Sequence, residues 1–81
     1  MTTVVVTYTH EPPLDDEALA AFDKKLRRCI EVREVKWVTT YLSLDRKTMF
    51  AVFEAANAEL VVMAHGMSGT RYERCVPMRV V

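Results

Sequence analysis

The sequence predicts an α+β domain in which strands and helices follow the order βαββαβ. Three observations support this order: β-branched and aromatic runs mark strands, apolar residues at helical spacing mark helices, and turn residues separate them. The order is that of the ferredoxin-like split βαβ pattern, a four-stranded antiparallel sheet with two helices on one face. The chain has 81 residues. We therefore expect a single domain over residues 1–81, near the lower size limit at which one core is stable alone.

The first strand and the first helix have the clearest signals. Residues 2–9, TTVVVTYT, are β-branched or aromatic almost throughout, which is typical of a strand. Pro12 and Pro13 end this strand. The first helix follows over residues 14–31, with Asp15 as the expected N-cap. Its apolar positions recur at helical spacing: Leu19, Phe22, Leu26, Cys29 and Ile30.

Residues 37–55 predict a hairpin with two different faces. If Asp45 and Arg46 form the turn, one face is small and apolar, as expected beneath helices: Val38 with Phe53, Thr40 with Ala51 and Leu42 with Met49. The other face mixes aromatic, hydroxyl and carboxylate groups: Trp37 with Glu54, Thr39 with Val52, Tyr41 with Phe50 and Ser43 with Thr48. An exposed face of this kind usually marks an interaction surface. We expect a second copy of the chain to cover it, giving a symmetric homodimer.

The last third predicts a short helix and a final strand. The helix over residues 57–66 would begin at its N-cap Asn57 and end at Gly66. Residues 71–81 would form the last strand, which Pro77 places at an edge of the sheet.

Composition excludes several kinds of partner. No run approaches the roughly 20 apolar residues of a membrane span, and the start lacks signal-peptide features, so we expect a cytoplasmic protein without a membrane partner. The 11 basic residues equal the 11 acidic ones, which leaves no excess charge for a phosphate backbone. Met49 and Ala51 stand where RNA-binding strands carry aromatics, so no nucleic-acid partner is expected. Cys29 and Cys75 are expected as reduced thiols.

Three segments resemble a known family: VKWVTTYLS, KTMFAVFEA and HGMSGTRYERCVPMRVV. They are similar to a group of small bacterial proteins, long uncharacterised and now described as nickel-binding. Trp37, Tyr41, Glu54 and Ala55 stand on the family's positions, whereas Phe53 replaces its usual Tyr. The resemblance implies a dimeric ferredoxin-like fold and binding of nickel or another divalent transition metal.

His10 and His65 are the candidate metal ligands, because nickel prefers imidazole nitrogen together with oxygen ligands. In a βαββαβ sheet the end of the first strand and the end of the second helix lie at one edge. The turn at Asp45 lies there too, and Glu11 follows His10 directly. Alternatively, each histidine is solvated or is bonded to a backbone carbonyl.

Trp37, Tyr41, Ser43 and Glu54 form a candidate ligand-binding group on the hairpin. Burial in a dimer would favour the protonated form of Glu54 and allow it to act as a general base, with His65 as the second catalytic candidate. Alternatively, Glu54 binds backbone amides or pairs with an arginine. Three functions remain open: a dimeric protein that binds a small ligand or metal, a cofactor-free isomerase, cyclase or monooxygenase acting in a dimer cavity, or a purely structural partner subunit. No organic cofactor is expected, because coenzyme fingerprints are missing from the sequence.

Overall fold

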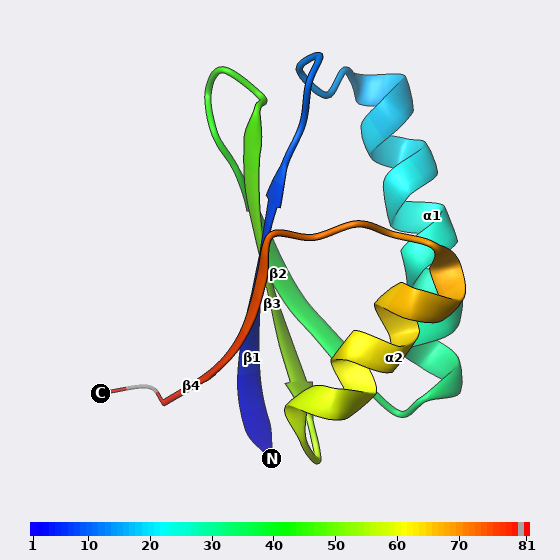
Figure 1. Ribbon diagram of the computed structural model, residues 1–81, viewed down its shortest axis with the longest axis vertical. Helices are drawn as coiled ribbons and strands as arrows, with labels where there is room; N and C mark the ends of the chain where they lie inside the picture. The colour runs from blue at the N-terminus through cyan, green and yellow to red at the C-terminus, as the bar shows by residue number, and fades with distance from the viewer. Residues whose placement is uncertain (80) are drawn as a thin grey trace.

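The computed structural model describes residues 1–79 and 81. Its elements follow in the order β1 (Thr2–Thr9), α1 (Asp16–Val32), β2 (Lys36–Leu42), β3 (Thr48–Ala55), α2 (Ala58–Ser68) and β4 (Arg74–Met78). The strands form one antiparallel sheet in the order β2-β3-β1-β4, and both helices cover the same side of it (Figure 1). The predicted ferredoxin-like fold is confirmed, with Pro77 on an edge strand as expected.

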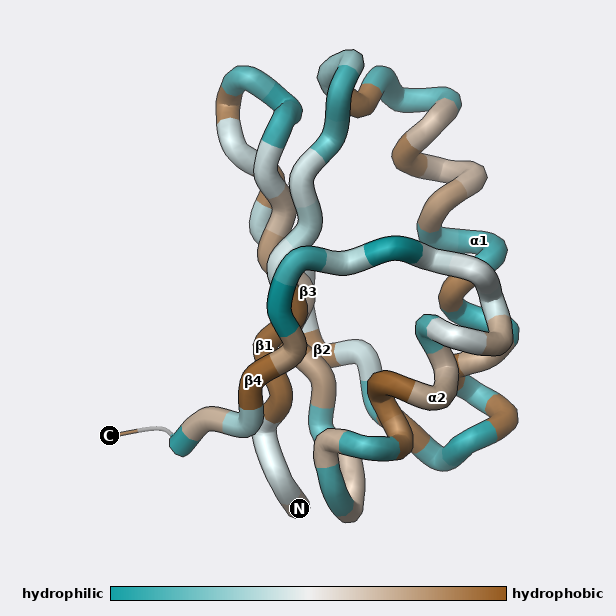
Figure 2. Tube along the Cα trace, viewed as in Figure 1, coloured by the Kyte–Doolittle hydropathy of each residue, from teal (hydrophilic) through white to brown (hydrophobic). Residues whose placement is uncertain are grey.

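The hydrophobic core lies between the sheet and the two helices. Alternate residues of the central strands are buried there: Val4, Val6 and Tyr8 of β1 with Met49, Ala51, Phe53 and Ala55 of β3. The helices contribute Leu26, Ile30, Val61 and Ala64. Hydrophobic segments lie along the strands and along α2, whereas the loops are mainly hydrophilic (Figure 2). In the part of the chain that the structure describes, neither helix is long and apolar enough to cross a membrane.

The start of β2 departs from the predicted pairing. The pairs nearer the turn are confirmed: Thr39 with Val52, Thr40 with Ala51, Tyr41 with Phe50 and Leu42 with Met49. The register then shifts between Trp37 and Thr39, so that Trp37 lies opposite Phe53 and Lys36 lies opposite Glu54. One additional residue in a strand turns everything before it to the other face. The predicted pairs of Trp37 with Glu54 and of Val38 with Phe53 are therefore wrong, and Val38 is exposed.

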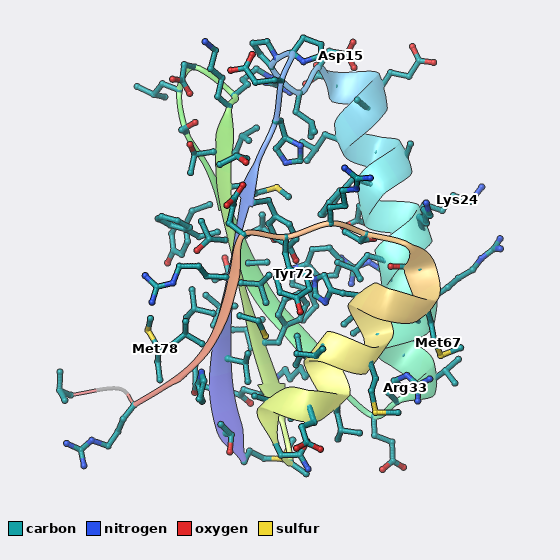
Figure 3. The ribbon with its side chains drawn as sticks, in the orientation of Figure 1. Asp15, Lys24, Arg33, Met67, Tyr72 and Met78 are labelled. Carbon is teal, nitrogen blue, oxygen red and sulfur yellow. The ribbon has the colours of Figure 1, made fainter. Side chains whose placement is uncertain are left out.

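The face of the sheet away from the helices, called the open face here, carries apolar side chains from all strands. Its residues follow from the register: Thr3, Val5, Thr7, Thr9, Lys36, Thr39, Tyr41, Thr48, Phe50, Val52, Glu54, Arg74, Val76 and Met78. Tyr41 is 63% exposed and Phe50 is 45% exposed. Figure 3 shows Met78 on the side of the sheet opposite the helices. The uncovered aromatic surface that the hairpin predicted is present, without Trp37.

Helix α2 ends two residues later than predicted. Asn57 caps its start by accepting the Leu60 N–H at 3.1 Å, as expected. The helix then continues through Gly66 to Ser68, and Gly69, with φ 71°, forms the left-handed C-cap. The prediction that Gly66 ends the helix is therefore wrong. Two glycines close together made the choice ambiguous, because either one can take the left-handed conformation.

Replacing each of the two glycines by alanine should give opposite effects on stability. Gly66→Ala should stabilise the protein by about 0.5–1 kcal/mol, because alanine is the better helix former and a Cβ there meets nothing within 4 Å. Gly69→Ala should destabilise it by about 1–2 kcal/mol, because alanine resists the left-handed conformation. Urea unfolding followed by circular dichroism measures both changes. Equal effects of the two substitutions would contradict the observed helix end.

Candidate functional site

The loop after β1 is fixed to the hairpin turn between β2 and β3. The His10 N–H donates to the Lys47 carbonyl at 2.7 Å, and the Leu14 N–H donates to the Arg46 carbonyl at 2.8 Å. The Arg46 side chain donates to the Leu14 carbonyl and to the Asp16 carboxylate. These bonds hold His10 at the same edge of the sheet as the turn, as the topology predicted.

The imidazole of His10 is held by two aromatic rings. It stacks on Tyr8, with ring centroids 6.4 Å apart, and meets the Phe22 ring edge-on at 5.8 Å. Its Nε2 atom is buried and has no hydrogen-bond partner among the residues described. Burial lowers the pKa of His10, which favours the neutral ring. A buried nitrogen without a partner is uncommon in native proteins.

His10 lines a pocket of about 620 Å³, called the His10 pocket here. It lies between the loop after β1, one side of α1 and the segment that follows α2. Apolar side chains form much of its wall: Pro12, Leu14, Ala18, Ala21 and Phe22. Lys25 and Arg71 bring positive charge to it, and Glu11, which also lines it, lies 3.8 Å from the Lys47 ammonium. The pocket therefore combines an imidazole, an apolar wall, two cationic groups and one carboxylate.

His65 occupies a different environment, deep beneath the sheet. It is 1% exposed, and both ring nitrogens are hydrogen-bonded: Nδ1 at 2.7 Å from the Val61 carbonyl and Nε2 at 2.5 Å from the Tyr8 hydroxyl. Because a carbonyl only accepts, Nδ1 carries the proton, and Nε2 accepts from the hydroxyl. Burial lowers the pKa of His65 and raises the pKa of Tyr8.

The two histidines thus lie near one another but do not face a common site. Both stack on Tyr8, with centroids 5.6 Å apart for His65, so the topological argument brought them to the correct end of the sheet. Of the two, only His10 lines a pocket. Tyr8 escaped the sequence analysis, which read it only as a strand residue. A tyrosine on the buried face must find a partner for its hydroxyl, and a histidine on the covering helix is a suitable one.

Lowering the pH should destabilise the protein through both histidines. Their pKa values are below the unfolded value of about 6.5, so below that pH the unfolded chain binds more protons than the folded one. The free energy of unfolding should therefore fall as the pH drops from 7.5 to 5, by up to about 1.4 kcal/mol per pH unit for the buried His65 and by less for His10, which is only partly buried. Urea unfolding at fixed protein concentration measures this slope. His65→Gln should reduce it, and a slope that the substitution leaves unchanged would contradict this assignment.

Trp37 lies on the helix side of the sheet and lines a second pocket of about 540 Å³ between α1 and β2. Its Nε1–H donates to the Thr40 hydroxyl at 2.7 Å, and the Arg27 guanidinium lies 4.7 Å from the ring centroid. Asp16 and Asp23 also line this pocket, but each is paired with an arginine. Trp37 therefore fills an edge between helix and sheet, and the structure separates it from the other predicted ligand residues.

The remaining predicted residues stay on the open face or in the turn. Ser43 donates to the Asp45 carboxylate at 2.6 Å and accepts the Thr48 N–H at 3.0 Å, which makes it a turn residue. The hydrogen bond that the Ser43 hydroxyl donates lowers the pKa of Asp45. Tyr41 and Glu54 lie on the open face, and neither lines one of the two pockets above. The structure places Glu54 and His65 on opposite sides of the sheet.

Two comparisons with known proteins identify the family and the fold. A family model described as nickel responsive protein SCO4226-like matches residues 5–78. The crystal structure of SCO4226 from Streptomyces coelicolor A3(2) superposes with a TM-score of 0.84 at 11% identity and covers 98% of each chain. At this identity the likeness shows the fold alone. No curated protein sequence matches the chain.

Proposed function

Because the chain belongs to the SCO4226-like family of nickel responsive proteins, we propose that it is a dimeric binding protein that holds a small ligand in the His10 pocket. The family match confirms the resemblance drawn from the segments beginning at Val35. The lining of this pocket by His10 together with Lys25 and Arg71 is the observation that supports this binding position. A ligand that pairs with these groups would be held there.

The dimer part of the proposal is supported by the open face. Its apolar residues come from every strand, and several of the large ones are exposed: Tyr41, Phe50 and Met78. Exposed large apolar side chains gathered on one sheet face of a small domain usually mark an interaction surface. A second copy, placed by a two-fold axis, buries the same patch on both chains and adds to a core that is small for independent stability. This arrangement leaves the His10 pocket accessible, because the pocket lies at the helix side of the sheet.

Nickel is the second candidate ligand, which the family favours. Among the residues that the structure describes, no three His, Cys, Asp or Glu side chains are grouped closely enough to hold a metal ion. Both ring nitrogens of His65 are already hydrogen-bonded. Of the described His, Cys, Asp and Glu residues, His10 and the adjacent Glu11 line the pocket. Tetragonal or octahedral nickel sites need about four to six ligands, more than these two side chains supply. One chain by itself therefore does not fit a resident nickel ion.

An enzymatic function receives less support. The proposed general base Glu54 and the second candidate His65 lie on opposite sides of the sheet, so they cannot act on one substrate within a chain. Glu54 also lies opposite Lys36 rather than beside Trp37. No observation on the open face favours a reaction over simple association.

Thermal unfolding with and without ligands tests the binding proposal. We expect the midpoint of the wild-type protein to rise with at least one probe from a panel of nickel chloride and small acidic, basic and neutral aromatic compounds, because a ligand that binds only the folded state stabilises it. His10→Ala should abolish that rise. Glu59→Ala, at an exposed position on α2 outside the pocket, is the control and should retain it. A panel without any effect, or a rise that persists in His10→Ala, would contradict the proposal.

A further inference from the structure

We propose that the ligand of the His10 pocket is a small organic carboxylate with an apolar body, an inference that rests on the proposed binding function. The pocket brings three kinds of group to one volume: the His10 ring, two cations set against the single carboxylate of Glu11, and an apolar wall. Each kind matches one part of such a molecule.

The cations favour a negatively charged group. Within the described part of the chain, neither Lys25 nor Arg71 has a carboxylate within ion-pair distance, whereas nearby acidic groups are engaged elsewhere. Glu11 lies 3.8 Å from the Lys47 ammonium, and Glu73 accepts a hydrogen bond from the Thr9 hydroxyl at 2.7 Å. The Lys25 ammonium lies near Gly69, 3.6 Å from where a Cβ on that residue would be. Two cations from different elements thus border one pocket without a charged partner of their own.

The wall favours an organic body over an inorganic anion. Ala18 and Phe22 of α1, with Leu14 just before the helix, form an apolar side of the pocket. Burying a ligand's apolar surface against it would strengthen binding. The volume of about 620 Å³ is within the range of about 300–1,000 Å³ that small-molecule sites occupy. An inorganic phosphate would leave this surface in contact with water.

His10 would give the ligand its orientation. The loop carrying it is fixed by backbone hydrogen bonds to the hairpin turn, and its ring is held between Tyr8 and Phe22. A neutral imidazole carries one N–H, and where that N–H faces the pocket it donates a charge-assisted hydrogen bond to a carboxylate oxygen. The guanidinium and ammonium groups at the margin would then share the second oxygen with solvent.

Calorimetric titration of the wild-type protein with three ring compounds of similar size tests the inference: benzoate, benzamide and benzylamine. We expect benzoate to bind at least about tenfold more tightly than benzamide and benzylamine, because only benzoate can pair with the cations. His10→Ala should weaken benzoate binding about tenfold or more. Lys25→Met and Arg71→Met should each weaken it about two- to fivefold, as expected for exposed charges.

Lys24→Met is the matched control, because Lys24 is the neighbouring lysine of α1 and its side chain points away from the molecule (Figure 3). Benzoate affinity should not change in this variant. Tighter binding of benzamide or benzylamine that depends on His10 would overturn the carboxylate assignment and leave the binding function intact. If none of the three compounds binds and the broader panel also has no effect, both the assignment and the binding function fail.

Discussion

Phe50→Asp should convert the protein from a dimer into a monomer and lower its melting midpoint. Phe50 lies on the open face next to its cross-strand partner Tyr41, and in the proposed dimer both rings are buried against the second copy. Each aromatic side chain buries about 150–250 Å² in such a setting, and an aspartate at its centre would be a charge without a partner. Size-exclusion chromatography with light scattering measures the mass, and a thermal scan measures the midpoint.

Met63→Asp provides the matched control for this experiment. Met63 is 49% exposed, close to the 45% of Phe50, but it lies on α2 and away from the open face. The control should remain dimeric. A wild-type protein that is monomeric at high concentration, or a Phe50→Asp variant that still dimerises, would show that another chain does not cover the open face.

Removing one member of the buried Tyr8–His65 pair should destabilise the protein. Tyr8→Phe leaves the buried Nε2 of His65 without a donor, and His65→Leu leaves the buried Tyr8 hydroxyl without an acceptor. Each should cost about 1–3 kcal/mol, the usual penalty for an unsatisfied buried polar group. In a domain of this size about 1 kcal/mol shifts the midpoint by about 4–8 °C.

The double variant Tyr8→Phe/His65→Leu isolates the energy of the interaction between the two side chains. Because it removes both polar groups, its loss of stability should be smaller than the sum of the two single losses. Tyr72→Phe is the control, since no side-chain hydrogen bond of the Tyr72 hydroxyl is found in the described part of the chain. It should change the free energy of unfolding by less than about 0.5 kcal/mol. Additive losses in the double variant would contradict a direct bond between the two side chains.

The fold could be predicted from the sequence because its signals are local. Strand composition, helical spacing and the N-caps Asp15 and Asn57 each depend on a few neighbouring residues, and the structure confirms them. The shift in register at Val38 could not be predicted, because a bulge depends on how the far end of β2 meets the helix. That single residue moved Trp37 from the predicted ligand group to the edge of α1.

The candidate site was predicted in part. Topology brought His10 and His65 to one end of the sheet, but it does not say how deeply a side chain is buried or whether its ring nitrogens are already bonded. The hydrogen bond from the Tyr8 hydroxyl occupies the Nε2 of His65. The pocket beside α1 gives His10 a surface that a ligand can reach. Both features arise from packing between elements that are distant in the sequence.

Histidine-ring NMR of the wild-type protein tests the central claim, binding at His10, most directly. Long-range ¹⁵N spectra would be recorded as benzoate, and in a separate sample nickel chloride, is added, with signals assigned from His10→Gln and His65→Gln variants. We expect the His10 Nε2 signal to shift or broaden saturably with at least one of the two probes. His65 should keep its Nδ1–H form and its position, because both of its nitrogens are bonded within the core. A response at His65 with none at His10, or no response of either ring, would contradict binding at the His10 pocket.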